Sequence, residues 1–397
     1  MVEPIDFHRF HSVTLPALLA SGNGALAGPD ATAIGPLAIA TPEGVYTYRG
    51  TGDGVEILAG DEAAKTVVGL DLDSWRGLVS DLETPPSLFY SGRLDVVRGN
   101  PLRFVRWEPA LRAMFHGRPI YDAARVDLRD RTGEPLDVGR GFDFAEIATD
   151  PVDAQHFLQT AGYLWVQNAF TADEVAAMLA EVAVLHDEAR EGDQESWWGK
   201  NDHGEAVLCR VLTGARRPGL QQLHGDNRVN LVASLPGIEI RNDAGNGRDG
   251  ITVLWKTPNV VEGLADLPWH RDCGMGGHAV KCPSYVMTIC LTDGSPAAGE
   301  LKFLPGSQHT SHPFIDGREE NAPDGVSVPV AAGDMTIHVG DVMHVSMPPT
   351  STDGPHRISV LMGFSPPDAR HHRGERHYND VLLGADDGQV PHLTDLV

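Results

Sequence analysis

The sequence is poor in cysteine and in positive charge, and each shortage excludes classes of function. Four cysteines occur in 397 residues. None forms the C-x-x-C pair of a zinc knuckle, so we expect a reduced protein with free thiols. Lysine and arginine total 31 against 55 aspartates and glutamates, a net charge of −24. Because such a charge repels nucleic acids and anionic membranes, neither is an expected partner.

Long apolar runs are also missing. The chain contains no run of about eighteen apolar residues, the length that a membrane-spanning helix needs. The opening residues MVEPIDFHRF lack a basic region followed by an apolar core, so we do not expect a secretory signal there. The predicted location is cytoplasmic.

Glycine and proline are abundant, at 44 and 28 residues, which favours turns and short strands. The length exceeds what one core usually serves, so two domains are expected. Residues 1–120 are predicted to form a small α+β domain. Its pattern consists of a hairpin, further strands and two helical segments, predicted at 37–50, 55–60, 65–72, 91–101, 71–83 and 100–115. In the first helical segment Asp73 is the expected N-cap.

One strand of this domain resembles a known family. SGRLDVVRGN (91–100) is similar to the strand that leads into the last helix of sterol-carrier-protein-2-like domains. The resemblance implies a lipid-binding role for the first domain. A purely structural α+β domain without a ligand is the alternative.

Residues 121–150 are charged and contain few large apolar side chains, which predicts a linker with a short internal helix. A second domain is predicted over 151–397. The stretch 151–170 indicates a helix that stops at Gly162 and a following strand. Thr171 and Glu174 form a capping-box pattern before a helix that extends to about residue 190.

Polar residues 191–205 then predict an exposed loop or a lid. Beyond this region, short segments rich in β-branched residues alternate with turns, which indicates a β-sandwich or open barrel. The predicted strands lie within 251–258, 284–293, 300–307, 334–347 and 357–364.

The stretch DLPWHRDCG (266–274) contains a histidine and an aspartate two residues apart, His270 and Asp272. Residues at this spacing on a strand point to the same side. A non-haem iron(II) site needs two imidazoles and one carboxylate and leaves three positions open. The pair therefore supplies two of the three ligands if a distant histidine joins it.

Several downstream histidines compete for the third position. His344 is favoured because Arg357 follows it and opens an apolar strand, where a buried guanidinium indicates a bound carboxylate. His309 and His312 follow a Pro-Gly-Ser turn and are expected at the surface or beside the substrate. His338 is expected to be a strand residue packed near the site. The remaining candidates are His278 and His356.

Ordered motifs over 151–366 resemble the phytanoyl-CoA dioxygenase family of iron(II)/2-oxoglutarate oxygenases. They are HFLQTAGYLWVQNAFTADEV, LWKTPN, WHRD, GELKFLPGSQHTSH and a GD-x9-H-x-S segment with a later arginine. The resemblance implies a double-stranded β-helix (jelly-roll or cupin-like) catalytic domain. It also implies three cofactors or cosubstrates, namely Fe(II), 2-oxoglutarate and O2.

The same resemblance assigns residues. It implies His270, Asp272 and His344 as metal ligands, and it places Arg357 and Ser346 on the far carboxylate of 2-oxoglutarate. Lys256 and Thr288 fall where the family has further cosubstrate contacts. The chain departs from the family at Arg271, where glutamine is common between the two ligands. It also departs in the glycine-rich loop 273–282, which lacks the usual aromatic residue, so substrate selection is expected to differ.

The resulting hypothesis is a dioxygenase that hydroxylates an unactivated C–H bond of a small apolar, lipid-like or natural-product substrate. Asp272 favours hydroxylation, because related halogenases carry a small residue at that position. The alternatives are a lipid-binding carrier or sensor with a vestigial metal site, and a cupin-type isomerase or hydrolase using another metal. The expected partner is a small molecule, and the oligomeric state is open, with a homodimer as one option.

Overall fold

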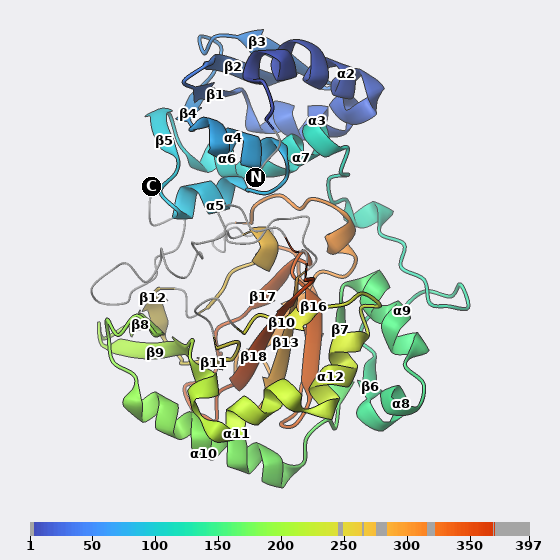
Figure 1. Cartoon of the computed structure of the whole chain (residues 1–397), viewed down its shortest axis with the longest axis vertical. Helices are drawn as coiled ribbons and strands as arrows, with labels where there is room; N and C mark the ends of the chain where they lie inside the picture. The colour runs from blue at the N-terminus through green and yellow to red at the C-terminus, as the bar shows by residue number, and fades with distance from the viewer. Residues whose placement is uncertain are drawn as a thin grey trace.

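The computed structural model describes residues 4–244, 249–263, 266–274, 284–315, 322–367 and 369. Two units lie one above the other along the long axis of the molecule (Figure 1). Each unit has its own apolar core, one built from residues between Phe7 and Phe115 and the other from residues between Phe142 and Phe364. Two separate cores agree with the length of the chain.

The N-terminal unit contains a five-stranded sheet in the order β3-β2-β1-β4-β5. The predicted hairpin is present, and β1 pairs antiparallel with β2, whereas β1 and β4 are parallel. The strands match the predicted positions and are β1 (Leu37–Thr41), β2 (Gly44–Gly50), β3 (Val55–Ala59), β4 (Thr66–Gly69) and β5 (Asp95–Arg98).

Helices cover this sheet, and Trp75 and Trp107 are fully buried between them. The N-cap of α4 is Asp71 rather than the predicted Asp73, because the Asp71 carboxylate accepts a hydrogen bond from the Ser74 amide. The helical segments of the unit are α1 (Phe7–Arg9), α2 (Leu15–Leu18), α3 (Gly24–Ile34), α4 (Leu72–Val79), α5 (Pro85–Tyr90), α6 (Leu102–Arg106) and α7 (Glu108–His116), with π-helical turns at Phe10–Thr14 and Leu19–Asn23.

The predicted linker carries structure of its own at its end. A 3-10 turn at Ala123–Arg125 precedes β6 (Gly141–Asp143) and α8 (Phe144–Thr149). Strand β6 pairs in parallel with β7, so residues 141–143 join the larger sheet. The domain limits at 120 and 150 stay predictions, while the pairing shows where the second sheet begins.

The start of the second unit follows the predicted pattern. Helix α9 (Val152–Ala161) ends at Gly162, which has a φ of 88°, and β7 (Tyr163–Gln167) follows directly. A left-handed C-cap of this kind favours glycine. Helix α10 (Ala172–Glu188) begins with the predicted reciprocal capping box between Thr171 and Glu174.

Two sheets face each other in this unit. The larger contains ten described strands in the order β12-β8-β9-β11-β18-β13-β16-β7-β6, with β10 beside β18, and the smaller has the order β15-β14-β17. Their bounds are β8 (Ser196–Asn201), β9 (Ala206–Val211), β10 (Arg241–Asn242), β11 (Thr252–Trp255), β12 (Val260–Glu262), β13 (Tyr285–Cys290), β14 (Leu301–Phe303), β15 (Val326–Val328), β16 (Met335–Val339), β17 (His344–Ser346) and β18 (Ile358–Ser365).

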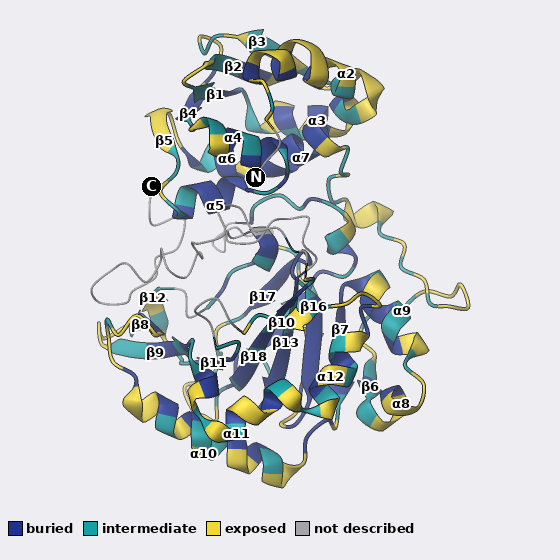
Figure 2. Cartoon of the chain, viewed as in Figure 1, coloured by how far each residue is buried: buried dark blue, intermediate teal, exposed yellow. Residues whose placement is uncertain are grey.

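The ring of Phe303 on β14 stacks on Tyr163 on β7, with ring centroids 4.4 Å apart. This contact packs the small sheet onto the inner face of the large one, as in a double-stranded β-helix, and the predicted fold class is confirmed. Helices cover the outer face (Figures 1 and 2), namely α10, α11 (Pro218–Gln221) and α12 (Asn227–Ser234). Apolar side chains such as Met287 and Ile289 contribute to the core.

The prediction of an exposed loop or lid over 191–205 is wrong for its central part. Residues 196–201 form β8, which pairs with β9 and β12. Trp197 is 1% exposed. The polar residues around it gave the segment the composition of a loop, although successive side chains of a strand alternate between its two faces.

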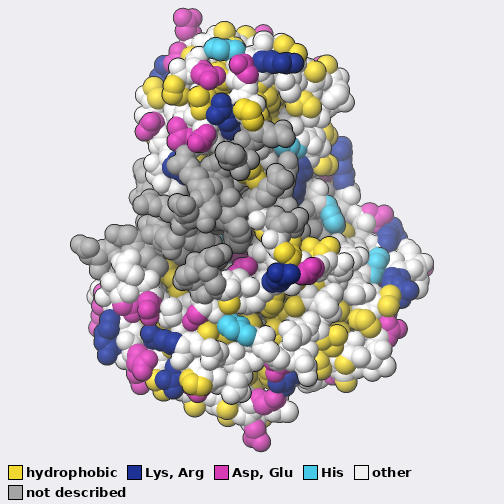
Figure 3. Space-filling view, viewed as in Figure 1, with side chains coloured by type: hydrophobic (Ala, Val, Ile, Leu, Met, Phe, Trp, Pro, Cys, Tyr) yellow, Lys and Arg dark blue, Asp and Glu magenta, His cyan; other side chains and the backbone are white. Residues whose placement is uncertain are grey.

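On the face shown in Figure 3, acidic and basic side chains are interspersed on the described surface of both units. Within the described part of the chain, no helix combines the length and the apolar character that crossing a membrane requires. The described cysteines Cys209, Cys273 and Cys290 are buried and take part in no disulfide.

Candidate metal and cosubstrate site

The two histidines predicted as metal ligands lie opposite each other on neighbouring backbone segments. His270 and His344 form an antiparallel bridge in which each amide donates to the other's carbonyl, at 2.9 and 3.0 Å. Their rings lie 4.1 Å apart. The fold therefore brings together two residues separated by 74 positions in the sequence.

Asp272 completes the cluster. Its Oδ1 atom lies 3.4 Å from Nε2 of His270 and 3.7 Å from Nε2 of His344. One ligand atom from each of the three residues lies within 4.8 Å of the others. This is the spacing of donors around one shared ion, so the structure brings the three predicted ligands together.

Backbone carbonyls fix the orientation of both imidazoles. Nδ1 of His270 lies 2.7 Å from the carbonyl of Pro268, and Nδ1 of His344 lies 3.0 Å from that of Val342. A proton on each Nδ1 leaves each Nε2 as a lone-pair donor that faces Asp272. Metal-binding histidines commonly donate their second N–H in this way.

His338 lies on β16 beside the cluster, as predicted. Its Nε2 is 3.1 Å from Oδ2 of Asp272, the oxygen that does not face the other two histidines. With its proton on Nε2, His338 donates to the carboxylate and orients it. Nδ1 of His338 has no hydrogen-bond partner among the described residues.

The charge states of the cluster suit metal binding. Burial opposes the ionisation of Asp272, but the neighbouring imidazoles of His344, His270 and His338 outweigh it and hold the pKa of Asp272 well below its usual range. Burial and the neighbouring His270 lower the pKa of His344 well below its ordinary value. At neutral pH the site therefore presents an anionic carboxylate and a neutral imidazole, the forms that coordinate a metal.

The donor set fits iron(II). Two nitrogen atoms and one carboxylate oxygen converge, and this is the facial arrangement of non-haem iron oxygenases. Among the described residues no cysteine belongs to the cluster, and the sulfur of the nearby Cys273 lies 3.0 Å from the hydroxyl of Ser284.

Arg357 lies at the start of β18 and is 3% exposed. One of its Nη atoms donates to Oγ of Ser346 at 2.6 Å, and its Nε has no hydrogen-bond partner. Among the described residues no carboxylate forms an ion pair with it, and burial lowers its pKa. A buried guanidinium without a counter-charge is costly, which fits a site for a carboxylate ligand.

The inner face of the large sheet carries further buried polar atoms without partners. The hydroxyls of Thr336 on β16 and Ser359 on β18 form no hydrogen bond within the described part of the chain. The strand register places both on the face that carries His338 and Arg357. Buried polar groups are normally satisfied, so a row of exceptions between two sheets indicates a ligand or ordered water.

Lys256 and Thr288, the other two predicted cosubstrate residues, lie on adjoining parts of this face. Lys256 follows β11, and its Nζ donates to Asp266 at 2.6 Å and to the carbonyl of Ser346 at 2.8 Å. Burial lowers its pKa to about 8, although Asp266 opposes the shift. Thr288 is buried on β13 between Thr336 and Leu361. Their proposed contact with 2-oxoglutarate stays a prediction.

Sequence reasoning missed Arg210. It lies on β9 with its guanidinium 4.9 Å from the ring centre of Trp197, and its positive charge acts on both Lys256 and Arg357. The signal in the sequence is an arginine inside the apolar strand AVLCRV (206–211). Three cationic side chains therefore gather at one side of the space between the sheets.

Some predicted features lie outside the described residues. They are His278, Cys282 and most of the glycine-rich loop, as well as the basic segment 371–377. His309 ends a 3-10 turn at Ser307–His309, and the ring of His312 lies 4.9 Å from Tyr121. Neither belongs to the cluster of three metal-ligand atoms.

The match to a family model agrees with the site. The model of the phytanoyl-CoA dioxygenase family matches residues 158–358. This stretch is half of the chain and includes His270, Asp272 and His344. The chain belongs to the phytanoyl-CoA dioxygenase family.

The individual proteins that resemble the chain share less than 30% sequence identity with it in the following comparisons. An ectoine dioxygenase from Bordetella parapertussis is 28% identical over 184 residues, which is 44% of this chain. The aligned region spans about half the length of that relative, 54%.

Solved structures that are similar include EctD from S. alaskensis with 2-oxoglutarate and 5-hydroxyectoine. It shares 20% identity at a TM-score of 0.46 and covers 64% of this chain and 88% of EctD. The non-heme alpha-ketoglutarate-dependent epimerase SnoN from nogalamycin biosynthesis is 22% identical, with a TM-score of 0.45. That match covers 61% of this chain and 96% of SnoN.

Proposed function

We propose that this chain is an iron(II)/2-oxoglutarate-dependent dioxygenase that hydroxylates an unactivated C–H bond of a small apolar, lipid-like or natural-product molecule. The balanced reaction converts substrate, 2-oxoglutarate and O2 into hydroxylated substrate, succinate and CO2. The observation that carries the proposal is the convergence of His270, Asp272 and His344, with both imidazoles held by backbone carbonyls.

In this proposal the three cluster residues hold Fe(II), and Arg357 with Ser346 binds the far carboxylate of 2-oxoglutarate. Bound iron supplies the activation of O2 that couples decarboxylation of 2-oxoglutarate to C–H oxidation. The chain itself orients the ligands through His338 and encloses the site between the two sheets. Exclusion of water from such a site limits side reactions.

Family membership and the orphaned polar atoms of the inner face both support the need for a polar cosubstrate. Asp272 occupies the position where related halogenases carry a small residue, which favours hydroxylation. The proposed substrate class follows from the sequence hypothesis. The names of the relatives, an ectoine dioxygenase and an epimerase from nogalamycin biosynthesis, refer to different compounds. The cytoplasmic location stays a prediction as well.

A direct test uses anaerobic protein. Adding Fe(II) and then 2-oxoglutarate to the full-length chain should give the charge-transfer absorbance of a bound 2-oxoacid. Succinate should form in air with a panel of apolar and lipid-like candidates. His344→Ala should lose both signals, whereas His203→Ala, at a histidine whose side chain is 76% exposed, should keep both.

A wild-type chain that binds no Fe(II), or that binds it without any response to 2-oxoglutarate, would overturn the proposal. The carrier hypothesis makes the opposite prediction for His344→Ala, because a lipid carrier keeps its ligand affinity when the metal site is lost. The likeness of residues 1–120 to lipid-binding domains remains a prediction of the sequence.

A further inference from the structure

Arg271 lies between two of the proposed metal ligands in the sequence, yet its side chain is 5% exposed and points away from them. Its guanidinium donates to Glu108, at the start of α7 in the N-terminal unit. A second donor of the same group reaches Oδ1 of Asp341 at 3.1 Å. One side chain therefore connects the ligand segment 270–272 to both units.

Asp341 lies three residues before His344, in the turn between β16 and β17. Besides Arg271 it binds Arg118, whose Nη2 donates to Oδ2 at 2.5 Å. Nη2 of Arg112 lies 3.6 Å from the same oxygen. The segment that carries the third ligand is thus held by the same charges as the segment that carries the first two.

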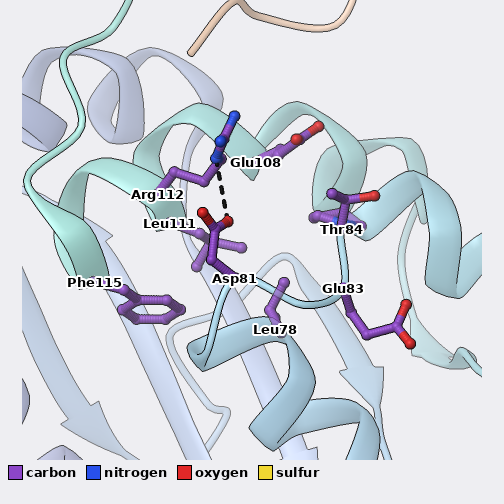
Figure 4. Close-up of a pocket in the computed structure, with 9 residues that line it drawn as sticks. Leu78, Asp81, Glu83, Thr84, Glu108, Leu111, Arg112 and Phe115 are labelled. Carbon is purple, nitrogen blue, oxygen red and sulfur yellow. Dashed lines mark ion pairs between the residues drawn. The ribbon is translucent and has the colours of Figure 1, made fainter. Parts of the chain in front are cut away.

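Arg112 extends the cluster into the N-terminal unit. Its Nε lies 3.3 Å from Oδ1 of Asp81, and Figure 4 shows this ion pair in the small pocket beside Glu108. We call the six residues the junction cluster. Three carboxylates face three guanidinium groups in it, and the members are Asp81, Glu108 and Asp341 with Arg112, Arg118 and Arg271.

Ion pairing offsets the effect of burial at two members of the cluster, Arg271 and Asp341. Burial opposes the charge of Arg271, but the carboxylates of Glu108 and Asp341 outweigh it and raise the pKa of the guanidinium. Burial likewise opposes the ionisation of Asp341, and the three arginines hold its pKa below the usual value. Removing one member of such a cluster leaves an uncompensated buried charge, so the remaining groups must move.

Apolar contacts fix the same junction. Tyr90 and Val105 of the N-terminal unit pack with Trp197 and Leu267 of the catalytic unit in one cluster of buried residues. Leu267 precedes His270 by three residues. The N-terminal unit therefore contacts the region of the ligand segment in two ways, by the ion pair of Glu108 with Arg271 and by apolar packing on Leu267.

We propose that Arg271 is a positioning residue through which the N-terminal unit, by Glu108, sets the placement of the His270–Asp272 segment relative to His344. The proposal rests on the metal site assigned under the proposed function. It gives the first 120 residues a role in metal binding that needs no lipid. It also means that deleting them removes Glu108, Arg112 and Arg118 and disturbs the catalytic unit directly.

The test uses the full-length apo protein and Co(II) as a spectroscopic substitute for Fe(II). The variants are Arg271→Gln, Glu108→Gln and the double variant, and cobalt affinity and the visible d–d spectrum are measured well below the unfolding temperature. Glu83→Gln is the matched control. Glu83 is a buried carboxylate of the same unit that pairs with Arg93 at 2.7 Å and is not a member of the junction cluster.

Each single variant should bind Co(II) about 10- to 100-fold more weakly, the effect typical of groups that orient metal ligands, with an altered d–d spectrum. The Co(II) affinity of the double variant should be no lower than that of the weaker-binding single variant, because both substitutions remove the same interaction. Glu83→Gln should lower the unfolding temperature without changing cobalt affinity or spectrum. If Arg271→Gln does not fold, Glu108→Gln carries the comparison.

Unchanged cobalt affinity and spectrum in Glu108→Gln, together with a lower unfolding temperature, would overturn the proposal and leave the cluster a folding role alone. An equal loss of affinity in Glu83→Gln would overturn it too, because any destabilisation of the unit would then suffice. A wild-type chain that binds neither Co(II) nor Fe(II) would refute the metal site itself, which distinguishes the two failures.

Discussion

At the scale of single residues, the site is defined by polar groups that are buried before any ligand arrives. Arg357 has one hydroxyl partner and an unpaired Nε. His338 forms a hydrogen bond to Asp272 through Nε2, and its Nδ1 has no hydrogen-bond partner among the described residues. Such groups cost stability in the folded chain, and the cost is offset only when a ligand or an ion binds. Two predictions follow from their separate partners.

Replacing Arg357 should affect 2-oxoglutarate and spare the metal. In Arg357→Gln the bidentate charge-assisted pair with the far carboxylate is lost, so the 2-oxoglutarate concentration for half-maximal absorbance should rise about 10- to 100-fold. Cobalt affinity should stay within about twofold of wild type. The measurement is a 2-oxoglutarate titration of the Fe(II) protein without oxygen. A variant with wild-type 2-oxoglutarate affinity would show that the carboxylate binds elsewhere.

Replacing His338 should affect the metal first. In His338→Phe the hydrogen bond to Oδ2 of Asp272 is lost, and metal affinity should fall about 10- to 100-fold. Thr336→Val is the control, because Thr336 lies on the same face of β16 and its hydroxyl has no partner among the described groups. Cobalt titration of both variants measures the difference. Equal affinities would exclude an orienting role for His338.

At the scale of elements, the turn between β16 and β17 holds the ligand segments in register. The amide of Gly340 donates to the carbonyl of Ser284 at 2.7 Å, and its carbonyl accepts from the amide of Cys273 at 3.0 Å. A Cβ atom on Gly340 would lie 2.4 Å from Oγ of Ser284 and 2.6 Å from Sγ of Cys273. Because Cys273 follows Asp272 directly, any shift at this turn reaches the site.

Gly340→Ala should therefore cost both stability and metal affinity. Overpacking a closed site of this kind costs about 1–3 kcal/mol, and the displaced Cys273 should weaken metal binding by moving Asp272. Thermal unfolding and cobalt titration measure the two effects. Gly225→Ala is the control, since no atom lies within 4 Å of an added Cβ there and its φ lies outside the left-handed range. Wild-type metal affinity in Gly340→Ala would mean that the turn absorbs the extra methyl group without moving Asp272.

At the scale of the whole molecule, two buried groups of the N-terminal unit make the stability of the chain depend on pH. In the N-terminal unit His11 is buried, with Nε2 2.7 Å from the hydroxyl of Tyr48 and Nδ1 2.7 Å from the carbonyl of Phe7. Burial lowers its pKa to about 4. Burial raises the pKa of Asp30 in the same unit to about 6, so the two groups act in opposite directions.

The sign for His11 follows from proton binding. Between pH 4 and pH 6.5 the unfolded chain binds a proton that the folded chain does not, so stability rises with pH in this range. The contribution amounts to about 3 kcal/mol over the window. Above pH 6.5 it is constant.

His11→Gln removes this dependence. The difference in unfolding free energy between wild type and His11→Gln should grow by about 3 kcal/mol as the pH rises from 4 to 6.5, because Asp30 cancels in the comparison. Urea unfolding of both proteins at several pH values measures it. His203→Asn, at an exposed histidine, should show no such trend. A difference that does not change with pH would show that His11 titrates alike in both states.

Much of the local structure was predictable from the residues. The hairpin of β1 and β2, the stop at Gly162 and the capping box at Thr171 depend on neighbours within a few positions. Their physical causes are turn geometry, a left-handed backbone and unpaired helix amides, and each is visible in a short window. Strand β8 was missed because the polar residues in and around it have the composition of a loop.

The sequence by itself singled out His270 and Asp272 as candidate metal ligands, because ligand chemistry and a spacing of two residues are local properties. It also singled out His344 and Arg357 through ordered motifs. Only the tertiary structure decided that Arg271 binds Glu108, 163 positions away, and that Asp341 joins both ligand segments. The sequence contains many carboxylates that could pair with Arg271, and no local rule selects Glu108 among them. The pairing depends on how the two separate cores pack against each other.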